Sequence, residues 1–146
     1  MTLSIKITPS INYAFALELT RSNMHYYYQK HQIEWEDACF TKNWEKSENL
    51  GVHQNNDCIG VIRLETDAQT CYLADLQLVP EVQSQGIGSY VLNYVKQLAK
   101  VRQKQLMSLV VFLDNPAVSL YRRNGFEIAQ RNDILARMEC DLSPAL

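Results

Sequence analysis

Two glycines one residue apart mark the segment of this chain that is best suited to hold an anion. Gly86 and Gly88 follow an apolar run that ends at Val79, and a stretch with helical spacing of apolar residues begins with them. Glycine lets the backbone approach a ligand closely, and the first N–H groups of a helix favour negative charge. The turn therefore predicts a phosphate site built from backbone amides.

Neither of two common nucleotide-binding signatures fits this turn. A dinucleotide fingerprint needs a third glycine near position 91, where the chain has Val91. The phosphate loop of NTPases needs a lysine before the Ser or Thr, but Ser89 follows Gly88 directly. Taken alone, the segment is also compatible with a strand-to-helix turn that binds nothing.

A second helix start lies beyond the next apolar run. Asn115 and Pro116 have the residue types expected at an N-cap and at the first helical position, and Gly125 fits the residue just past the end. The sequence therefore predicts a short helix from Pro116 to residue 124.

The amino-terminal part predicts one strand followed by two helices. Leu3, Ile5 and Ile7 alternate with polar residues, and Pro9 with Ser10 indicates the end of that strand and a helix start. A second helical stretch is expected to carry Trp35, Cys39, Phe40 and Trp44.

The remaining elements alternate in the manner of an α/β fold. A hairpin is expected to turn at residues 55–57, because Asn-Asn-Asp separates two strand-like runs. The helix after the glycine turn should cover the sheet, and the valine- and leucine-rich run after it should form a parallel, buried strand. The expected ranges are strands 58–64, 71–79, 106–112, 126–129 and 134–140, with a helix over 87–101.

Length and charge limit the function classes. The chain has 146 residues, so we expect one domain over residues 1–146. Its net charge of −2 leaves no basic excess for nucleic acid. No window approaches a membrane span, and the first ten residues lack the pattern of a secretory signal. We expect a cytoplasmic protein with neither nucleic acid nor membrane as partner.

Cysteines and histidines give no metal pattern. No two cysteines are spaced as C-x-x-C, and we expect reduced core thiols at Cys39, Cys58, Cys71 and Cys140. His25, His31 and Cys39 match no familiar zinc spacing, so no metal is expected.

Two motifs in a fixed order resemble those of the GNAT acetyltransferases. They are Gln83-x-x-Gly86-x-Gly88, which opens the long helix, and Asn115-Pro116-Ala117-x-x-Leu120-Tyr121-x-x-x-Gly125-Phe126 after the next strand. The likeness covers about residues 52–140, and the spelling of residues 73–81 is similar to that of a bacterial group whose acceptors are mostly unassigned.

The resemblance implies a fold, a co-substrate and a reaction. The fold is α/β, or α+β by some schemes, with a mixed sheet of about seven strands splayed between strands 4 and 5 and flanked by about four helices. The co-substrate is acetyl-CoA, without a metal. The reaction is direct transfer of the acetyl group to a primary amine of a small molecule, peptide or protein.

It also implies cofactor contacts in three places. The pyrophosphate would lie on backbone amides of Gln83, Ser84, Gln85, Gly86, Ile87, Gly88 and Ser89. Upstream, the backbone of Leu76, Leu78 and Val79 would pair with the pantetheine arm as an added strand does. Downstream, the expected contacts are Asn115, Ala117, Tyr121 and Arg123.

Tyr121 is the residue that the resemblance places near the departing sulfur. A phenol of pKa about 10 is a weaker acid than a thiol of pKa about 8.5, so full proton transfer to the thiolate runs uphill by roughly 2 kcal/mol. We therefore expect Tyr121 to stabilise the thiolate by a hydrogen bond more than by protonating it. A packed aromatic ring is the structural alternative.

The residues of the glycine turn differ from the pattern that is common in the family. Arginine or lysine is usual inside the turn, where this chain has Ser84 and Gln85. Arg122 or Arg123 on the later helix is a candidate for the missing positive charge, although exposed arginines on short helices are more often simply solvated.

An amine acceptor needs a base, because an ammonium group of pKa about 10.4 costs on the order of 4 to 5 kcal/mol to deprotonate at neutral pH. Asp75, which precedes the expected pantetheine contacts, and Glu65 are the candidates, each with a solvated surface carboxylate as the alternative. Glu34, Asp37 and His53 carry no motif that favours them.

Dense aromatics in residues 26–44 lie where the family's acceptor pocket is usually shaped. Tyr28 and Trp35 are the candidates for acceptor binding, and core packing is the alternative for each ring. The rival to catalysis is a non-catalytic acyl-CoA sensor or interaction module with the same fold. A homodimer is compatible with the resemblance, and neither the acceptor nor the acyl preference can be read from the sequence.

Overall fold

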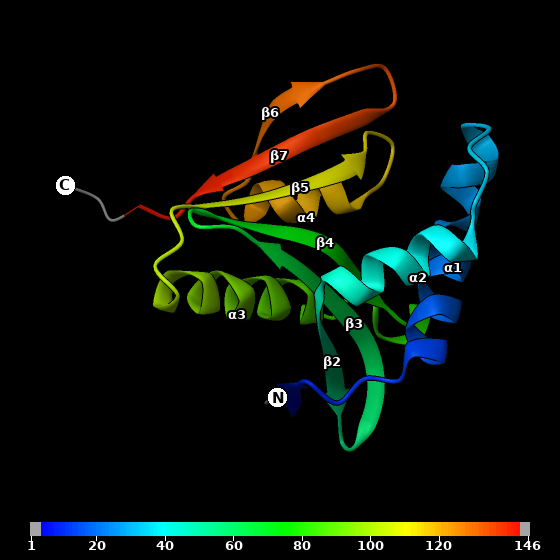
Figure 1. The fold of residues 1–146 in the computed structure, drawn as a ribbon, viewed down its shortest axis with the longest axis horizontal. Helices are drawn as coiled ribbons and strands as arrows, with labels where there is room; N and C mark the ends of the chain where they lie inside the picture. The colour runs from blue at the N-terminus through cyan, green and yellow to red at the C-terminus, as the bar shows by residue number, and fades with distance from the viewer. Residues whose placement is uncertain (1–3, 144–146) are drawn as a thin grey trace. The chain divides into compact units, whose positions relative to one another are not determined.

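The computed structural model describes residues 4–143, so the predicted strand residue Leu3 lies outside the described residues. These residues form seven strands and four α-helices, as predicted (Figure 1). In chain order the elements are β1 (Ile5–Thr8), α1 (Tyr13–Lys30), α2 (Asp37–Lys46), β2 (Glu48–Gln54), β3 (Asp57–Thr66), β4 (Thr70–Leu78), the 3-10 turn η1 (Pro80–Val82), α3 (Ile87–Val101), β5 (Leu106–Phe112), α4 (Ala117–Arg123), β6 (Glu127–Arg131) and β7 (Leu135–Asp141).

The strands form one mixed sheet in the order β1-β2-β3-β4-β5-β7-β6. β4 and β5 run parallel, with Thr70 opposite Leu106, which confirms the predicted parallel connection through α3. The pairs β1–β2, β2–β3, β5–β7 and β6–β7 are antiparallel. The mixed seven-stranded α/β architecture is therefore the one expected.

The chain divides into two compact units. The first unit is Met1–Leu64 with Ala74–Ile87, and the second is Glu65–Leu73 with Gly88–Leu146. Strands β3 and β4 contribute residues to both units. The expectation of a single domain stays a prediction.

The β2–β3 hairpin of the first unit turns where its sequence predicted. Asn55 and Asn56 have φ values of 52° and 72°, and Gln54 pairs with Asp57 across the turn. Two-residue hairpin turns of this kind need positive φ at both central positions, which asparagine tolerates better than most residues. The local turn chemistry therefore sets the register of this hairpin.

Helix α1 begins later than expected. Its N-cap is Asn12, whose Oδ1 accepts a hydrogen bond from the N–H of Phe15 at 2.9 Å, so the predicted start at Ser10 is wrong. The Ser10 N–H instead donates to the Thr8 side chain. A short irregular connection thus precedes a helix whose first N–H groups are satisfied by Asn12.

The boundary between the two first helices also differs from the prediction. α1 continues to Lys30, and Trp35 lies in the segment before α2 rather than on a helix. Cys39 is on α2 but exposed, so the prediction of a core thiol is wrong there, whereas Cys71 and Cys140 are buried as expected. Phe40 is the only residue of α2 that is buried.

The first unit has a small apolar core between its helices and β3. Ala16 and Leu19 of α1, Phe40 of α2 and Val61 of β3 are buried together. Tyr13 packs edge-on against Trp44, with ring centroids 5.6 Å apart. Phe40 and Trp44 of this aromatic region therefore serve packing.

A buried ion pair lies beside this core. The Arg63 side chain, 6% exposed, donates from Nη2 to Oδ2 of Asp75 at 2.8 Å, and the Asp75 side chain is 16% exposed. The Arg63 Nη1 also donates to Ser47 Oγ at 3.1 Å, and its guanidinium lies 5.0 Å from the centre of the Phe40 ring. One arginine thus connects β3 with β4, with α2 and with Ser47, the residue that caps the end of α2.

The second unit places β5 between β7 and the start of β4 (Figure 1). Met107 and Leu109 of β5 are buried, and so are the α3 residues Ile87, Val91, Leu92, Val95 and Ala99. Tyr94 and Val101 of the same helix are 39% and 80% exposed. The buried stripe of α3 therefore runs along Val91, Leu92, Val95 and Ala99.

Helix α4 has the predicted position but a different cap. The helix begins at Ala117 with Pro116 at the N-cap, so the assignment of Asn115 as N-cap is off by one residue. The Asn115 Oδ1 still accepts from the N–H of Ala117 at 2.9 Å, and Gly125 has a φ of 93° just beyond the helix. An Asx turn at Asn115 therefore provides the capping hydrogen bond that the sequence predicted.

The buried ion pair gives a stability prediction. Replacing Arg63 in the variant Arg63→Met keeps an apolar chain over Phe40 but leaves the Asp75 carboxylate without its partner, so the free energy of unfolding should fall by about 3 to 5 kcal/mol. Urea unfolding at neutral pH measures this. The control Arg21→Ala removes two ion pairs of an arginine that is 42% exposed, and it should lower the free energy of unfolding much less than Arg63→Met does. Equal losses for the two variants would contradict the prediction.

Candidate functional site

The glycine turn has a backbone suited to an anion. After η1, Ser84 and Gly86 have φ values of 65° and 81°, and α3 starts at Ile87. Left-handed residues interleaved with ordinary ones turn successive N–H groups toward one side, which makes an anion-binding nest. The 15-residue helix α3 adds the positive end of its dipole at the same place.

The two glycines serve different purposes. A Cβ on Gly86 would meet nothing within 4 Å, so the space beside this residue is open. A Cβ on Gly88 would lie 3.0 Å from Cδ2 of Leu120, which shows that Gly88 allows the start of α3 to pack closely against α4. Gly86 is therefore the glycine that fits the close approach of a ligand.

The polar side chains of the turn point back onto the chain. Gln85 Nε2 donates to the carbonyl of Glu81 at 3.1 Å, and Gln83 Nε2 donates to the carbonyl of Leu78 at 3.0 Å. These glutamines hold the turn in shape. Any anion bound here would be held mainly by backbone N–H groups.

The end of β4 has fewer backbone groups for a ligand than the sequence suggested. The Leu78 carbonyl also accepts from Asn23 Nδ2 at 3.0 Å, so side chains occupy both of its lone pairs. The Val79 N–H donates to the Ile59 carbonyl at 2.8 Å. A ligand strand pairing at Leu76, Leu78 and Val79 would therefore depend on the Leu78 N–H and on Leu76.

The sequence did not indicate that Asn23 contacts the end of β4. Asn23 lies on α1, more than fifty residues from the strand that it contacts, and its Nδ2 also donates to Gln77 Oε1 at 3.1 Å. A single polar residue within a helix gives no signal of such a partner. Only the packing of α1 against the end of β4 reveals it.

Asp75 is mostly buried rather than solvated, with 16% of its side chain exposed. Arg63 donates to its Oδ2 and Gln77 donates to its Oδ1 at 3.2 Å. Burial raises the pKa of the Asp75 carboxyl, and the charge of Arg63 opposes this in part. A raised pKa suits a base, but both carboxylate oxygens already hold a structural hydrogen bond. Glu65, the other candidate base, is half-buried in the second unit.

The less favoured proton-transfer candidates have structural partners or are exposed. Asp37 accepts from Arg21 and from Trp35, and His53 Nε2 lies 2.9 Å from the carbonyl of Ser10. Glu34 is exposed. Within residues 4–143, no three His, Cys, Asp or Glu side chains gather as a metal site would require.

The second unit positions the remaining predicted cofactor contacts. Asn124 Nδ2 donates to Ser89 Oγ at 3.2 Å and to the Leu120 carbonyl at 2.8 Å, so it ties the start of α3 to the end of α4. Tyr121 is 8% exposed and packs edge-on against Phe126, with centroids 5.8 Å apart. Arg123 is exposed. The packed ring does not conflict with a hydroxyl that reaches a ligand.

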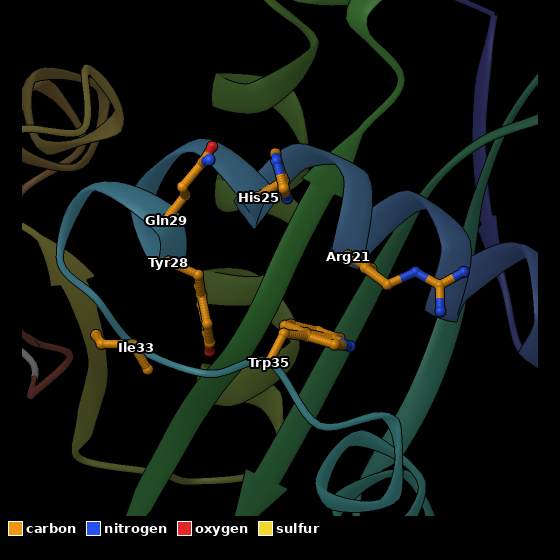
Figure 2. Close-up of a pocket in the computed structure, with 6 residues that line it drawn as sticks. All are labelled: Arg21, His25, Tyr28, Gln29, Ile33 and Trp35. Carbon is orange, nitrogen blue, oxygen red and sulfur yellow. The ribbon is translucent and has the colours of Figure 1, made fainter.

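A pocket in the first unit brings the two predicted acceptor residues together. Its volume is about 280 Å³, and Figure 2 shows the rings of Tyr28 and Trp35 between α1 and the segment that carries Ile33 and Trp35. The two ring centroids are 5.2 Å apart at 65°. The full lining is Arg21, His25, Tyr28, Gln29, Ile33 and Trp35.

Four of these lining residues were not predicted for this role. Arg21, His25 and Gln29 lie on one face of α1 with Tyr28, a helical spacing that could have been read from the sequence had the helix been known to reach Lys30. Ile33 comes from the segment between the helices, whose path only the fold defines.

Comparison with known proteins gives a consistent picture. The profile described as the acetyltransferase (GNAT) family matches residues 16–126. A search of curated proteins finds no match. None of the helices in the described part of the chain is long and apolar enough to cross a membrane.

Several solved structures share the fold. A PaiA N-acetyltransferase from Thermoplasma acidophilum in complex with coenzyme A is 21% identical, with a TM-score of 0.78 over 95% of this chain and 99% of that one. The ribosomal-protein-S18-alanine N-acetyltransferase from Escherichia coli is 22% identical, with a TM-score of 0.74 over 97% and 96%. A GNAT family acetyltransferase from Elizabethkingia anophelis with acetyl-CoA bound is 17% identical, with a TM-score of 0.75 over 94% and 98%.

The Tyr28 phenol should lose its proton at a higher pH than a free tyrosine does. Burial, with the negative charges of Asp75 and Cys39 as smaller causes, raises the pKa of Tyr28, so the folded state holds this proton above pH 10, where a free tyrosine loses it. The stability that follows is present below about pH 10 and is lost as the pH rises through the folded pKa.

Phenolate absorbance of the wild-type protein and of Tyr28→Phe, between pH 9 and 12, measures the difference, with circular dichroism to verify the native state at each pH. The free energy of unfolding of the wild type should decrease relative to Tyr28→Phe above about pH 10. A difference in phenolate absorbance between the two proteins that titrates at or below pH 10 would contradict the raised pKa of Tyr28.

Proposed function

The chain belongs to the acetyltransferase (GNAT) family, and on this premise we propose that it transfers an acetyl group from acetyl-CoA directly to a primary amine of a small molecule, peptide or protein. The observation that carries the proposal is the glycine turn with its open Gly86, followed in the same chain by the capped helix of Tyr121. The proposed location is the cytoplasm, the proposed unit is a single domain, and a homodimer is compatible with it.

The pyrophosphate is proposed to bind the backbone amides between Gln83 and Ser89. The left-handed conformations at Ser84 and Gly86 support this, because they turn N–H groups toward the start of α3. The Ser89 hydroxyl accepts a hydrogen bond from Asn124, which leaves its own proton to donate to a phosphate oxygen. Asn115, Ala117 and Arg123 complete the proposed contacts on the second unit.

The pantetheine arm is proposed to run along the end of β4. Because side chains already bond the Leu78 carbonyl, the Leu78 N–H and the Leu76 backbone are the proposed contacts, and Val79 contributes less. A backbone N–H at this place would also polarise the thioester carbonyl as the amine attacks it.

The transfer itself needs a base and a stabilised leaving group. The amine gives up a proton, its nitrogen attacks the thioester carbonyl carbon, and the carbon–sulfur bond breaks as coenzyme A leaves as a thiolate. Tyr121 is proposed to donate a hydrogen bond to that thiolate. Asp75 or Glu65, directly or through a water molecule, is proposed to take the proton, with Asp75 favoured because burial raises its pKa.

The rival function is a non-catalytic acyl-CoA sensor with the same fold. Calorimetric titration with acetyl-CoA, together with a free-thiol assay over a panel of amines, separates the two. Thiol release that depends on an amine supports the transferase. Binding without release over the whole panel favours the sensor, and no binding at millimolar acetyl-CoA refutes both.

Tyr121→Phe tests the leaving-group role. Loss of one hydrogen bond to a developing charge should lower kcat about ten- to a hundredfold and leave the Kd for acetyl-CoA nearly unchanged. Steady-state kinetics and calorimetry measure the two quantities. Tyr90→Phe is the matched control, because Tyr90 lies on α3 with 43% of its surface exposed. An unchanged kcat for Tyr121→Phe would remove the residue from the mechanism.

Gln85→Arg tests the backbone cradle. A basic side chain at this position would add a phosphate contact that the turn lacks, so the Kd for acetyl-CoA should fall by about two- to fivefold, and the gain should disappear at high salt. Calorimetry at two ionic strengths measures this. Lys104→Arg, which preserves charge far along the sequence, is the control. A Kd for acetyl-CoA that does not respond to ionic strength in Gln85→Arg any more than in the wild type would argue against pyrophosphate at this turn.

A further inference from the structure

The pocket of the first unit has two chemically different sides. Tyr28, Ile33 and Trp35 give it apolar walls, with the two rings arranged edge to face. Arg21, His25 and Gln29 form its polar side from α1, as Figure 2 shows. Edge-to-face aromatic pairs accept a third ring in the same geometry, at centroid separations of about 4.5 to 7 Å.

The walls are held in place by the protein itself. The indole N–H of Trp35 donates to Asp37 Oδ1 at 2.7 Å, and Arg21 Nη1 donates to both carboxylate oxygens of Asp37 at 3.0 and 2.9 Å. The Ile33 N–H donates to the Tyr28 carbonyl at 2.8 Å. Asp37 thus fixes the Trp35 wall relative to α1 before any ligand binds, which lowers the entropy cost of binding.

The size of the pocket restricts its occupant. Pockets for drug-sized ligands have about 300 to 1,000 Å³, and this one has about 280 Å³. A space of this size holds one ring or one side chain, not an extended peptide.

The charge of Arg21, the arginine that lines the pocket, is balanced and so does not oppose an ammonium group nearby. Arg21 is neutralised by Glu18 and Asp37, which approach it to 2.6 and 2.9 Å. Asp75 is close enough to Tyr28 to affect its titration, and it lies next to Leu76 on β4.

We propose that this pocket binds the aromatic ring of the amine acceptor, with Asp37 as the positioning residue of its Trp35 wall. The acceptor class is a primary amine with an aryl group a short chain away from its nitrogen. This inference rests on the proposed acetyltransferase function, which supplies the need for an amine acceptor.

The experiment compares matched amines with the full chain. Phenylethylamine, cyclohexylethylamine, butylamine and a diamine are tested as acceptors in the free-thiol assay, with wild type, Tyr28→Ala, Trp35→Ala and Tyr26→Ala. The wild type should prefer phenylethylamine over butylamine by roughly ten- to a hundredfold in kcat/KM. Trp35→Ala and Tyr28→Ala should remove most of this preference by raising KM for the aryl amine.

Tyr26→Ala is the matched control, since Tyr26 is on the same helix, is 61% exposed and does not line the pocket. It should keep the preference. Asp37→Asn retains an acceptor for the indole N–H and should keep most of the preference, whereas Asp37→Ala should raise KM for the aryl amine with little change for butylamine. Equal losses for both amines would mean that Asp37 has a general structural role.

Equal kcat/KM for ring-bearing and straight-chain amines, or a preference that survives Trp35→Ala, would overturn the proposal. Failure of the acetyltransferase function is distinguished by a binding measurement. The two indole N–H resonances of Trp35 and Trp44 are assigned with Trp35→Phe, and phenylethylamine is titrated without acetyl-CoA. A saturable shift of the Trp35 resonance, absent with butylamine, supports the pocket even if no amine is acetylated, and no shift together with no preference refutes it.

Discussion

The ion pair between Arg63 and Asp75 is the interaction on which the arrangement of the first unit depends. The Arg63 guanidinium pairs with Asp75, donates to Ser47 and lies over the face of Phe40, so that one side chain connects two strands with α2. Charges as buried as these are tolerated only when each is paired and hydrogen-bonded. From Asp75 the network continues through Gln77 to Asn23, and so reaches α1 and the Leu78 carbonyl.

This network explains why the candidate site is assembled from backbone groups. Gln83 and Asn23 bond the Leu78 carbonyl from two directions, which fixes the end of β4 just before the glycine turn. A turn that lacks a basic side chain has to hold its amides in a fixed array before the anion binds. Ordering a flexible loop at the moment of binding would cost conformational entropy. In this chain polar side chains shape the cradle, and main-chain N–H groups are left to contact the ligand.

Much of the fold could be predicted, and the errors have physical causes. Asn55 and Asn56 specify their turn locally, and the spacing of apolar residues placed α3 and β5 correctly. Trp35 was assigned to a helix because apolar spacing alone does not show that α1 ends at Lys30. The cap of α1 was misplaced because Ser10 and Asn12 are both good caps, and the fold selects the second.

The sequence by itself determined the family, the mixed sheet with its parallel β4–β5 connection, and the position of the glycine turn, because these follow from local residue types and from two motifs in fixed order. Only the tertiary structure decided that Asp75 is buried against Arg63, that Gly88 is a packing residue while Gly86 faces open space, and that Asp37 holds Trp35 beside Tyr28. The Arg63–Asp75 and Gly88–Leu120 contacts join residues far apart in the chain, and the place of Trp35 beside Tyr28 depends on the path of the segment between α1 and α2. Their partners are set by how helices and strands pack, which no local pattern records.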